Sequence, residues 1–309
     1  MTETQPSPLR LLVTISIAIL AVSTASIFIR FAQSEAPSLV IAAWRLIFAS
    51  SILAIPALGK HRAELQKLTR KELLLGLASG IFLAFHFATW ITSLEYTSVT
   101  NSVVLVSTSP IWVAILAPFF LKEKITKTVI IGIILTLIGG TIIGLSDGCT
   151  LDGGIRCASP SGSGLGEGSL GNFLALAGAW TVAGYLMIGR RLRANLSLVP
   201  YIFLVYGMAA IVLLVMVLIS ANSLFGYSPI IYLWLLLMAI FPQLIGHSTY
   251  NWALRYLPVA LVAVTTLGEP IGSSILAFVI LKETPSIIQV VGGVLILAGI
   301  YVTSQKAET

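Results

Sequence analysis

Long apolar runs, separated by short polar joints, make up most of this chain. Each run is about 20 residues or longer, which is the length at which a helix crosses the hydrocarbon core of a bilayer. Short joints favour antiparallel neighbours in a bundle. The pattern therefore predicts ten membrane-spanning helices, at residues 11–31, 36–57, 72–94, 98–121, 127–146, 169–189, 197–219, 229–254, 259–281 and 285–304.

The chain also repeats itself with an offset of 160 residues. Residues 94–123 and 254–283 align without a gap. Both begin with Leu-x-Tyr, carry a proline in the middle (Pro110 and Pro270), and end with Leu-Lys-Glu. Two apolar helices do not easily share these residues in one register by chance, so we interpret the pattern as an internal duplication.

Each half of the duplication holds five of the predicted helices. Because five is odd, the second half enters the membrane in the opposite sense from the first. Inverted repeats of this kind are typical of secondary transporters, whose substrate site lies near the midplane between the halves. The predicted fold is an all-α integral membrane protein of two inverted five-helix repeats, at 1–146 and 169–309, joined by an extracytoplasmic loop at 147–168.

Composition agrees with a membrane protein. Of the 309 residues, 57% are hydrophobic and only 10% are charged, and the mean hydropathy is +0.99. A soluble domain carries about 25% charged residues. The composition therefore argues against a soluble globular enzyme. We read the apolar run after Arg10 as a first span and not as a cleaved signal, because no small-residue cleavage site precedes the next span.

The basic residues give an orientation. If the N-terminus is cytoplasmic, only Arg30, Arg156 and Lys282 of the 18 Lys and Arg residues fall in outer segments, and Arg45 falls within a span. Cytoplasmic loops carry the excess of basic residues, so we expect both termini to be cytoplasmic. This placement explains the net charge of +6 without a nucleic-acid partner.

The loop at 147–168 contains both cysteines of the chain. It is rich in Gly and Ser, a composition that is flexible and builds no core. Outside the cytoplasm, Cys149 and Cys157 are close enough in sequence for a disulfide. Two unrelated free thiols are the alternative. No His accompanies them, so we expect no metal site.

Glu269 is the sharpest chemical signal. It is an acid in the middle of a predicted span, followed at once by Pro270. A carboxylate at this depth is costly and normally faces a partner, a cavity or a transport path. It either binds a coupling proton or cation, or is a structural acid bonded to a neighbouring helix. Pro270 and its counterpart Pro110 loosen their helices, which suggests a part in gating.

Further polar residues in the spans predict a cavity. Arg45 in the second span must find an acceptor, which is either an anionic group of a substrate, Glu269, or a helix-end carbonyl. His86 and Trp90 share a helix face in the third span. His247, Tyr250 and Asn251 lie at nearly the same depth in the eighth span. We expect these six residues to bind substrate, although a His in a span is often an ordinary hydrogen-bonded core residue.

Other residues receive structural interpretations. Glu123 and Glu283 end their helices in matching places and are expected to hold helix ends at the membrane boundaries. Six aromatic residues are candidates for cavity walls, or else for core and interface positions: Trp44, Phe85, Trp112, Tyr185, Tyr206 and Trp234. No P-loop, G-x-S-x-G or H-E-x-x-H sequence occurs, so we expect neither an enzyme nor a bound cofactor.

Taken together, these motifs resemble the EamA family of the drug/metabolite transporter superfamily. The resemblance rests on the two Leu-x-Tyr…Pro…Leu-Lys-Glu segments, Glu269-Pro270 and Trp44-Arg45. It implies a ten-helix carrier, monomer or homodimer, in the bacterial plasma (inner) membrane, in contact with a small-molecule substrate and the lipid bilayer. Relatives in this family export amino acids, metabolites or toxic compounds. The long loop with its two cysteines departs from the short midpoint loop usual in the family.

We therefore predict a secondary transporter that exports a small metabolite, such as an amino acid or an aromatic compound, with proton coupling through Glu269. An uncoupled facilitator or a solute exchanger is the alternative within transport. An intramembrane lipid-modifying enzyme is the alternative of a different class. It is disfavoured because the chain offers no convincing cluster of nucleophile and base or of metal ligands.

Overall fold

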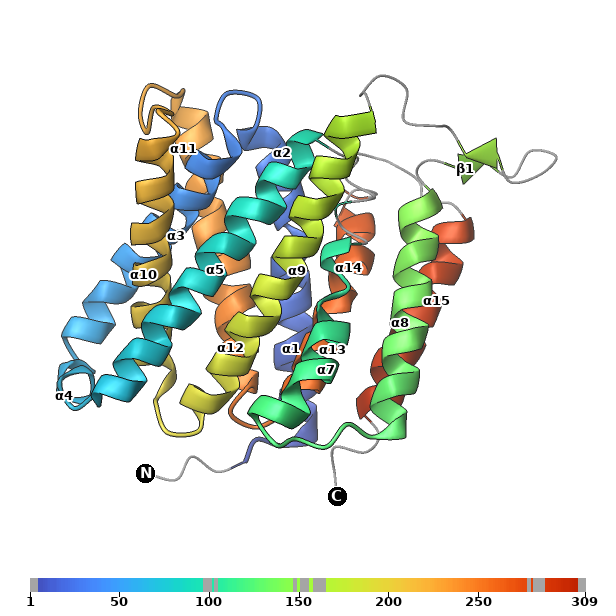
Figure 1. Cartoon of the computed structure of the whole chain (residues 1–309), viewed down its shortest axis with the longest axis horizontal. Helices are drawn as coiled ribbons and strands as arrows, with labels where there is room; N and C mark the ends of the chain where they lie inside the picture. The colour runs from blue at the N-terminus through green and yellow to red at the C-terminus, as the bar shows by residue number, and fades with distance from the viewer. Residues whose placement is uncertain are drawn as a thin grey trace.

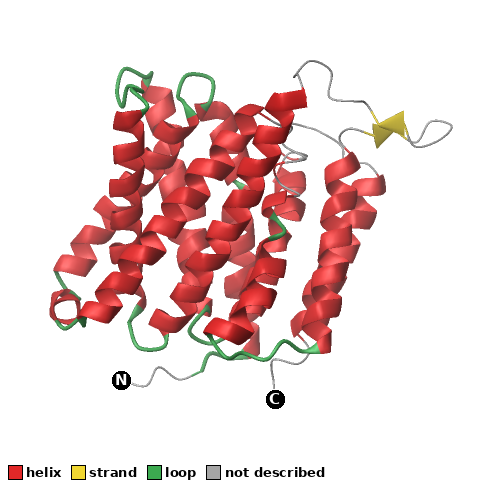
Figure 2. Ribbon diagram, in the orientation of Figure 1, coloured by secondary structure: helices red, strands yellow, loops and turns green. Residues whose placement is uncertain are grey.

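The computed structural model describes residues 5–96, 102, 105–146, 149–150, 156–157, 165–276, 279 and 287–304. Within these ranges the chain is a bundle of helices that run side by side (Figures 1 and 2). The first helix begins, and the last helix ends, at the same end of the bundle (Figure 1). We call this end the terminal end and the other the far end.

The helices of the first half follow one another with short joints. They are α1 (Pro8–Ser23), α2 (Ala25–Ala32), α3 (Ser38–Leu58), α4 (Arg62–Gln66), α5 (Arg70–Tyr96), α7 (Ser109–Phe120) and α8 (Lys127–Ser146). Two short antiparallel strands come next, β1 (Cys149–Thr150) and β2 (Arg156–Cys157). Their register places the backbone of Cys149 opposite that of Cys157. The disulfide stays a prediction, because their side chains lie outside the described part.

The second half begins with α9 (Leu165–Arg193) and α10 (Leu198–Ile219). Two of the helical segments that follow are interrupted. The first consists of α11 (Pro229–Met238), the π-helix η1 (Ala239–His247) and α12 (Ser248–Ala253). The second consists of α13 (Val259–Thr265), the 3-10 turn η2 (Thr266–Gly268) and α14 (Glu269–Leu276). The last helix is α15 (Ile287–Ser304).

Six helical segments in the described ranges are long and apolar enough to cross a membrane. They are Pro8–Ala32, Ser38–Leu58, Arg70–Tyr96, Leu170–Arg193, Leu198–Ile219 and Pro229–Ala253. Shorter apolar helices occupy Ser109–Phe120, Lys127–Gly139, Val259–Ser273 and Val290–Thr303. The six long segments coincide with six of the ten predicted spans, and the four shorter helices lie within the other four.

Besides the span with the π-helix η1, two predicted spans are broken next to a proline. The span predicted at 98–121 turns at Ser107 and Thr108, and α7 starts directly before Pro110. The span predicted at 259–281 changes to a 3-10 turn directly before Glu269-Pro270. Proline cannot donate a backbone hydrogen bond and crowds the preceding turn, so both breaks have the same cause.

Small residues set the closest helix contacts. A Cβ atom on Gly132 would lie 2.7 Å from the carbonyl of Gly299, and one on Gly299 would lie 2.7 Å from the carbonyl of Gly132. The backbones of α8 and α15 therefore touch, and the two helices form a pair at one side of the bundle (Figure 1). Close packing through small residues holds helices together where lipid offers no hydrophobic drive.

Helices α3, α10 and α11 begin without a side-chain cap of their own, and each receives one from a distant glutamate. Glu95 accepts a hydrogen bond from the N–H of Ser38 at the start of α3. Glu64 accepts from Ser197 before α10, and Glu35 accepts from Ser228 before α11. The bonds from Ser228 hold the pKa of Glu35 below its usual value. These caps satisfy otherwise unpaired N–H groups and join loops far apart in sequence.

The chain turns sharply after α7. Lys122 adopts a left-handed backbone conformation, with φ of 58°, which costs a residue with a side chain about 1–2 kcal/mol. This turn separates α7 from the segment 123–126 that leads to α8, and it sets the direction of the next residue, Glu123. A left-handed residue directly after a helix is a common way for the helix to end, and Ala221 after α10 has the same conformation, with φ of 54°.

Replacing Gly80 with Val tests the close packing of α5 against α10. A Cβ at Gly80 would lie 2.7 Å from the carbonyl of Val205, so the helices must separate, and we expect a loss of about 1–3 kcal/mol in stability. Thermal unfolding of the purified protein in detergent measures it. Gly207→Ala on α10 is the control, because a Cβ there meets nothing within 4 Å. Equal melting temperatures for Gly80→Val and the wild type would contradict the packing described here.

Candidate functional site

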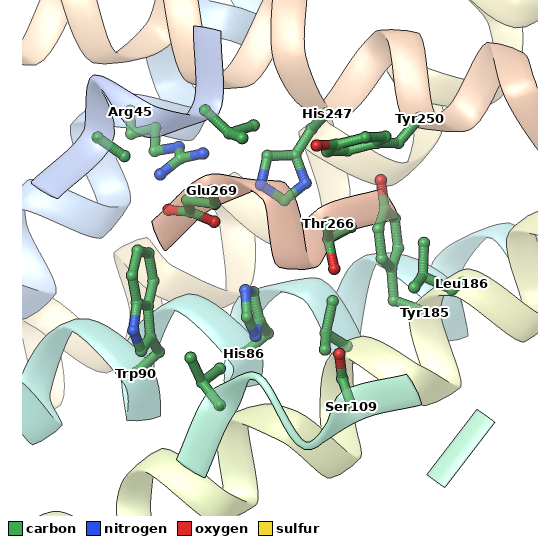
Figure 3. Close-up of a pocket in the computed structure, with 14 residues that line it drawn as sticks. Arg45, His86, Trp90, Ser109, Tyr185, Leu186, His247, Tyr250, Thr266 and Glu269 are labelled. Atoms are coloured by element: carbon green, nitrogen blue, oxygen red, sulfur yellow. The ribbon is translucent and has the colours of Figure 1, made fainter. Parts of the chain in front are cut away.

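An internal cavity lies where the two halves of the chain meet (Figure 3). Its volume is about 70 Å³, which is room for a few water molecules, since one needs roughly 10–15 Å³. Its walls come from helices of both halves, and they mix aromatic, charged and small side chains. The lining residues are Val22, Ala25, Arg45, His86, Trp90, Val106, Ser109, Val182, Tyr185, Leu186, His247, Tyr250, Thr266 and Glu269.

Arg45 is almost completely enclosed, with 1% of its surface exposed. Its Nε donates a hydrogen bond of 2.8 Å to Oε1 of Gln243. The guanidinium carbon lies 4.1 Å from the centre of the Phe87 ring, a cation–π contact. Nη1 has no hydrogen-bond partner. The guanidinium is therefore held at one edge and keeps an unused donor.

Gln243, which holds Arg45, belongs to the π-helix η1. Pro242 lies inside η1 and cannot donate a backbone hydrogen bond. The carbonyl of Gln243 accepts the backbone N–H of Ser248, five residues later, and also accepts from the hydroxyls of Ser248 and Tyr206. π-helical segments inside α-helices frequently occur at functional sites. Here the segment contains both Gln243 and His247, so it supplies one holder of Arg45 and one wall of the cavity.

Glu269 faces the same cavity as Arg45 (Figure 3). It is the first residue of α14, directly after the 3-10 turn. Among the described residues, no ion pair within 4.0 Å joins Arg45 to Glu269. The direct pairing that was one alternative for Arg45 is therefore not formed. Two opposite charges face one small space without touching.

Helix α1 packs against the residues on both sides of Glu269. A Cβ atom on Gly268 would lie 2.9 Å from the side chain of Ile19, and one on Gly272 would lie 2.1 Å from the hydroxyl of Ser23. That hydroxyl also donates to the backbone carbonyl of Glu269. The two glycines therefore allow α1 to approach the acid closely, which fixes one wall of the cavity.

The two histidines lie near each other across the cavity. Their ring centres are 6.5 Å apart, and His86 stacks on Trp90 at 5.9 Å. Nδ1 of His86 lies 3.0 Å from the carbonyl of Gly178. A carbonyl only accepts, so Nδ1 carries the proton, and Nε2 of the neutral ring is an acceptor. Nε1 of Trp90 has no hydrogen-bond partner.

Asn251 differs from the expectation for it. It is fully buried and does not line the cavity. Its amide donates to the hydroxyls of Tyr185 and Tyr206 and to the carbonyl of His247. Asn251 therefore supports Tyr185, which does line the cavity. The other five aromatic candidates, Trp44, Phe85, Trp112, Tyr206 and Trp234, lie outside the lining.

The remaining predicted residues have mixed positions. Pro110 is buried next to Ser109, which lines the cavity. Glu283 and the side chain of Pro270 lie outside the described residues. Sequence reasoning missed Thr266 as a lining residue. Its position three residues before Glu269, on the same side of the helical turn, was the available signal.

Comparison with known proteins supports an assignment. A sequence model described as "EamA-like transporter family" matches residues 9–145 and again residues 169–305. The chain belongs to the EamA family. It is a multi-pass membrane protein of a transporter family, which agrees with its apolar helices.

Individual relatives agree with this assignment. "Uncharacterized transporter YetK" of Bacillus subtilis is 28% identical over 78% of this chain and 71% of its own length. "Uncharacterized transporter YyaM" of the same organism is 27% identical over 85% and 83%. An "Uncharacterized transporter" of Archaeoglobus fulgidus is 25% identical over 91% and 92%. A solved structure titled "Crystal structure of protein" has a TM-score of 0.76 at 18% identity, covering 97% of this chain and 98% of its own, which shows the same fold.

Replacing Gln243 with Leu tests whether it holds Arg45. The change leaves Nε of a buried cation without an acceptor, so we expect a loss of about 1.5–3 kcal/mol in stability. In the Arg45→Met, Gln243→Leu double variant that penalty disappears, so the two effects should not add. Unfolding of the three purified variants measures the coupling. Additive losses would show that the hydrogen bond contributes nothing.

Proposed function

We propose that the protein is a secondary transporter of the bacterial plasma membrane that exports a small metabolite, such as an amino acid or an aromatic compound. The proposed fold is ten membrane-spanning helices in two inverted repeats, with both termini in the cytoplasm. Three observations support it. The family model matches the chain twice. The first helix begins and the last helix ends at the same end of the bundle (Figure 1), and with that end in the cytoplasm most basic residues of the joints lie on the cytoplasmic side.

The observation that carries the substrate proposal is the unbridged pair of charges. Arg45 keeps a free donor at Nη1, and Glu269 faces the same cavity. Charged groups this deep in a membrane need a partner. A solute with a carboxylate for Arg45 and an ammonium group or proton for Glu269 would supply both. Nε1 of Trp90, also without a partner, offers a further donor to such a solute.

The cavity is small for the larger of the proposed solutes. About 70 Å³ holds only a few water molecules. An aromatic solute therefore enters only when the helices around the cavity move apart. In this proposal the two irregular turns, η1 and η2, absorb part of that movement, because they carry His247 and Thr266 of the cavity wall.

Counterflow in proteoliposomes tests the substrate proposal. Vesicles are loaded with unlabelled amino acids or aromatic metabolites, and entry of a trace labelled solute is followed, which requires no knowledge of the coupling ion. We expect a zwitterionic solute to be accepted. Arg45→Gln should weaken its apparent affinity about 10- to 100-fold, the loss expected for one hydrogen bond to a charged group. Acceptance of only neutral or cationic solutes would refute the role of Arg45.

Glu269→Gln tests coupling. The amide keeps the shape of the side chain but cannot bind and release a proton, so we expect counterflow to persist while transport driven by a pH gradient is lost. Glu72→Gln, at the exposed start of α5, is the control and should leave both activities unchanged. A folded Glu269→Gln carrier with the pH response of the wild type would remove Glu269 from coupling and favour an uncoupled facilitator or exchanger.

A further inference from the structure

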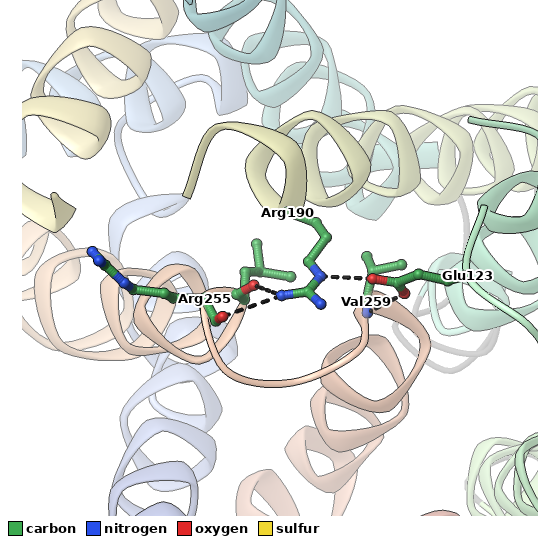
Figure 4. Close-up of polar contacts among 5 residues, drawn as sticks. Glu123, Arg190, Arg255 and Val259 are labelled. Carbon is green, nitrogen blue, oxygen red and sulfur yellow. Dashed lines mark hydrogen bonds and ion pairs between the residues drawn. The ribbon is translucent and has the colours of Figure 1, made fainter. Parts of the chain in front are cut away.

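Glu123 belongs to a polar cluster with Arg190 (Figure 4). Its Oε1 accepts a hydrogen bond of 2.6 Å from Nε of Arg190, which is also an ion pair. Its Oε2 accepts a bond of 3.1 Å from the backbone N–H of Val259, the first residue of α13. One carboxylate thus joins the segment after α7 to the end of α9 and the start of α13.

Arg190 extends the same cluster to a fourth segment. Its Nη1 donates to the carbonyl of Leu254 at 2.7 Å and to the carbonyl of Arg255 at 3.2 Å. These carbonyls follow the end of α12. The guanidinium therefore satisfies carbonyls at a helix end while it holds Glu123. We call Glu123, Arg190 and the backbone groups of Leu254, Arg255 and Val259 the terminal-end cluster.

The segments that the cluster joins contribute part of the cavity wall. Ser109 lies at the start of α7, Tyr185 in α9 and Tyr250 in α12, and all three line it. Thr266, which follows α13, is a fourth lining residue. Arg190 is five residues beyond Tyr185, or about 7 Å along the helix axis at 1.5 Å per residue. The cluster therefore lies about two turns or less from the cavity wall.

We propose that the terminal-end cluster is a gate, whose contacts break when the cavity opens toward the end of the bundle that carries both termini. A solute that leaves the cavity in that direction must pass between α7, α9, α12 and α13, which the cluster holds together. The proposal rests on the transport function proposed above, since a gate has no purpose in a protein that moves nothing.

One feature of the cluster suits a gate better than a permanent fastening. The side chains of Arg190 and Glu123 are 27% and 18% exposed, so water can replace their contacts when they part. The left-handed conformation of Lys122, directly before Glu123, is a common way for a helix to end, so it does not distinguish a gate from a fastening.

Access of a reagent to the cavity tests the gate without any solute. The reporter is Thr266→Cys, in full-length protein that also carries Cys149→Ser and Cys157→Ser, reconstituted in vesicles. A charged maleimide that cannot cross the membrane is added from one side at a time. A protease-cleavable tag at the C-terminus identifies the side that carries the termini.

With the gate intact, we expect slow labelling of the reporter from the terminal side. Glu123→Gln and Arg190→Gln should each speed it about three- to tenfold, the range expected for loss of a partly exposed, charge-assisted contact. The double variant should be no faster than either single variant, because both remove the same contact. Arg191→Gln is the matched control, since Arg191 is the exposed neighbour of Arg190, and it should label like the parent.

Several results would overturn the gate. They are fast terminal-side labelling of the parent, unchanged labelling in the folded Glu123→Gln and Arg190→Gln variants, or an equal increase in Arg191→Gln. Gel filtration and thermal unfolding confirm that each variant is folded, and Arg190→Gln carries the test if Glu123→Gln does not fold. A purely structural cluster would lower the unfolding temperature and leave labelling unchanged. If the labelling changes occur but no solute shows counterflow, the substrate proposal is refuted and the gate proposal is not.

Discussion

A buried guanidinium and a carboxyl group that face one cavity without touching set the requirements for the rest of this structure. A guanidinium at bilayer depth is stable only if the protein holds it, and Arg45 is held by Gln243 and the ring of Phe87. Glu269 faces the same space from another helix. Had the two formed a direct ion pair, the cavity would hold a neutral, satisfied unit. Because they are kept apart, the site retains the capacity to bind a charged guest between them.

Irregular backbone lies beside these two groups, and its position is informative. Backbone groups facing lipid must be paired within a helix, so departures from the α-helix are tolerated only in the protein interior or along a cavity. The two irregular turns in the second half, η1 and η2, both supply lining residues, His247 and Thr266. The regular helices α8 and α15, by contrast, pack closely against each other at one side of the bundle.

The amino-acid sequence predicts the chemistry of this site better than its geometry. Arg45, His86 and Glu269 stand out because a polar residue in an apolar run is conspicuous, and these residues share one cavity. Apolar periodicity could not reveal the π-helix η1, which contains Gln243, the residue that holds Arg45. Asn251 directly follows Tyr250 in α12, so its side chain leaves the helix in another direction, toward Tyr185 and Tyr206. Residue spacing fixes a helix face only while the helix remains regular.

Glutamates that accept hydrogen bonds at helix starts join neighbouring segments at the ends of the bundle. Short joints leave little room for a cap within the local sequence, so glutamates from distant segments accept N–H groups at or directly before the starts of α3, α10, α11 and α13. Such caps fasten neighbouring hairpins at low cost, because a carboxylate beside a helix start is favourable. Glu123 differs from Glu35, Glu64 and Glu95 in that its carboxylate is shared with an arginine close to the cavity wall. A residue that fastens a helix can therefore also control a pathway when the helices it joins enclose a binding space. In that case the helix-end role expected for Glu123 from the sequence and the gate proposed from its contacts do not exclude each other.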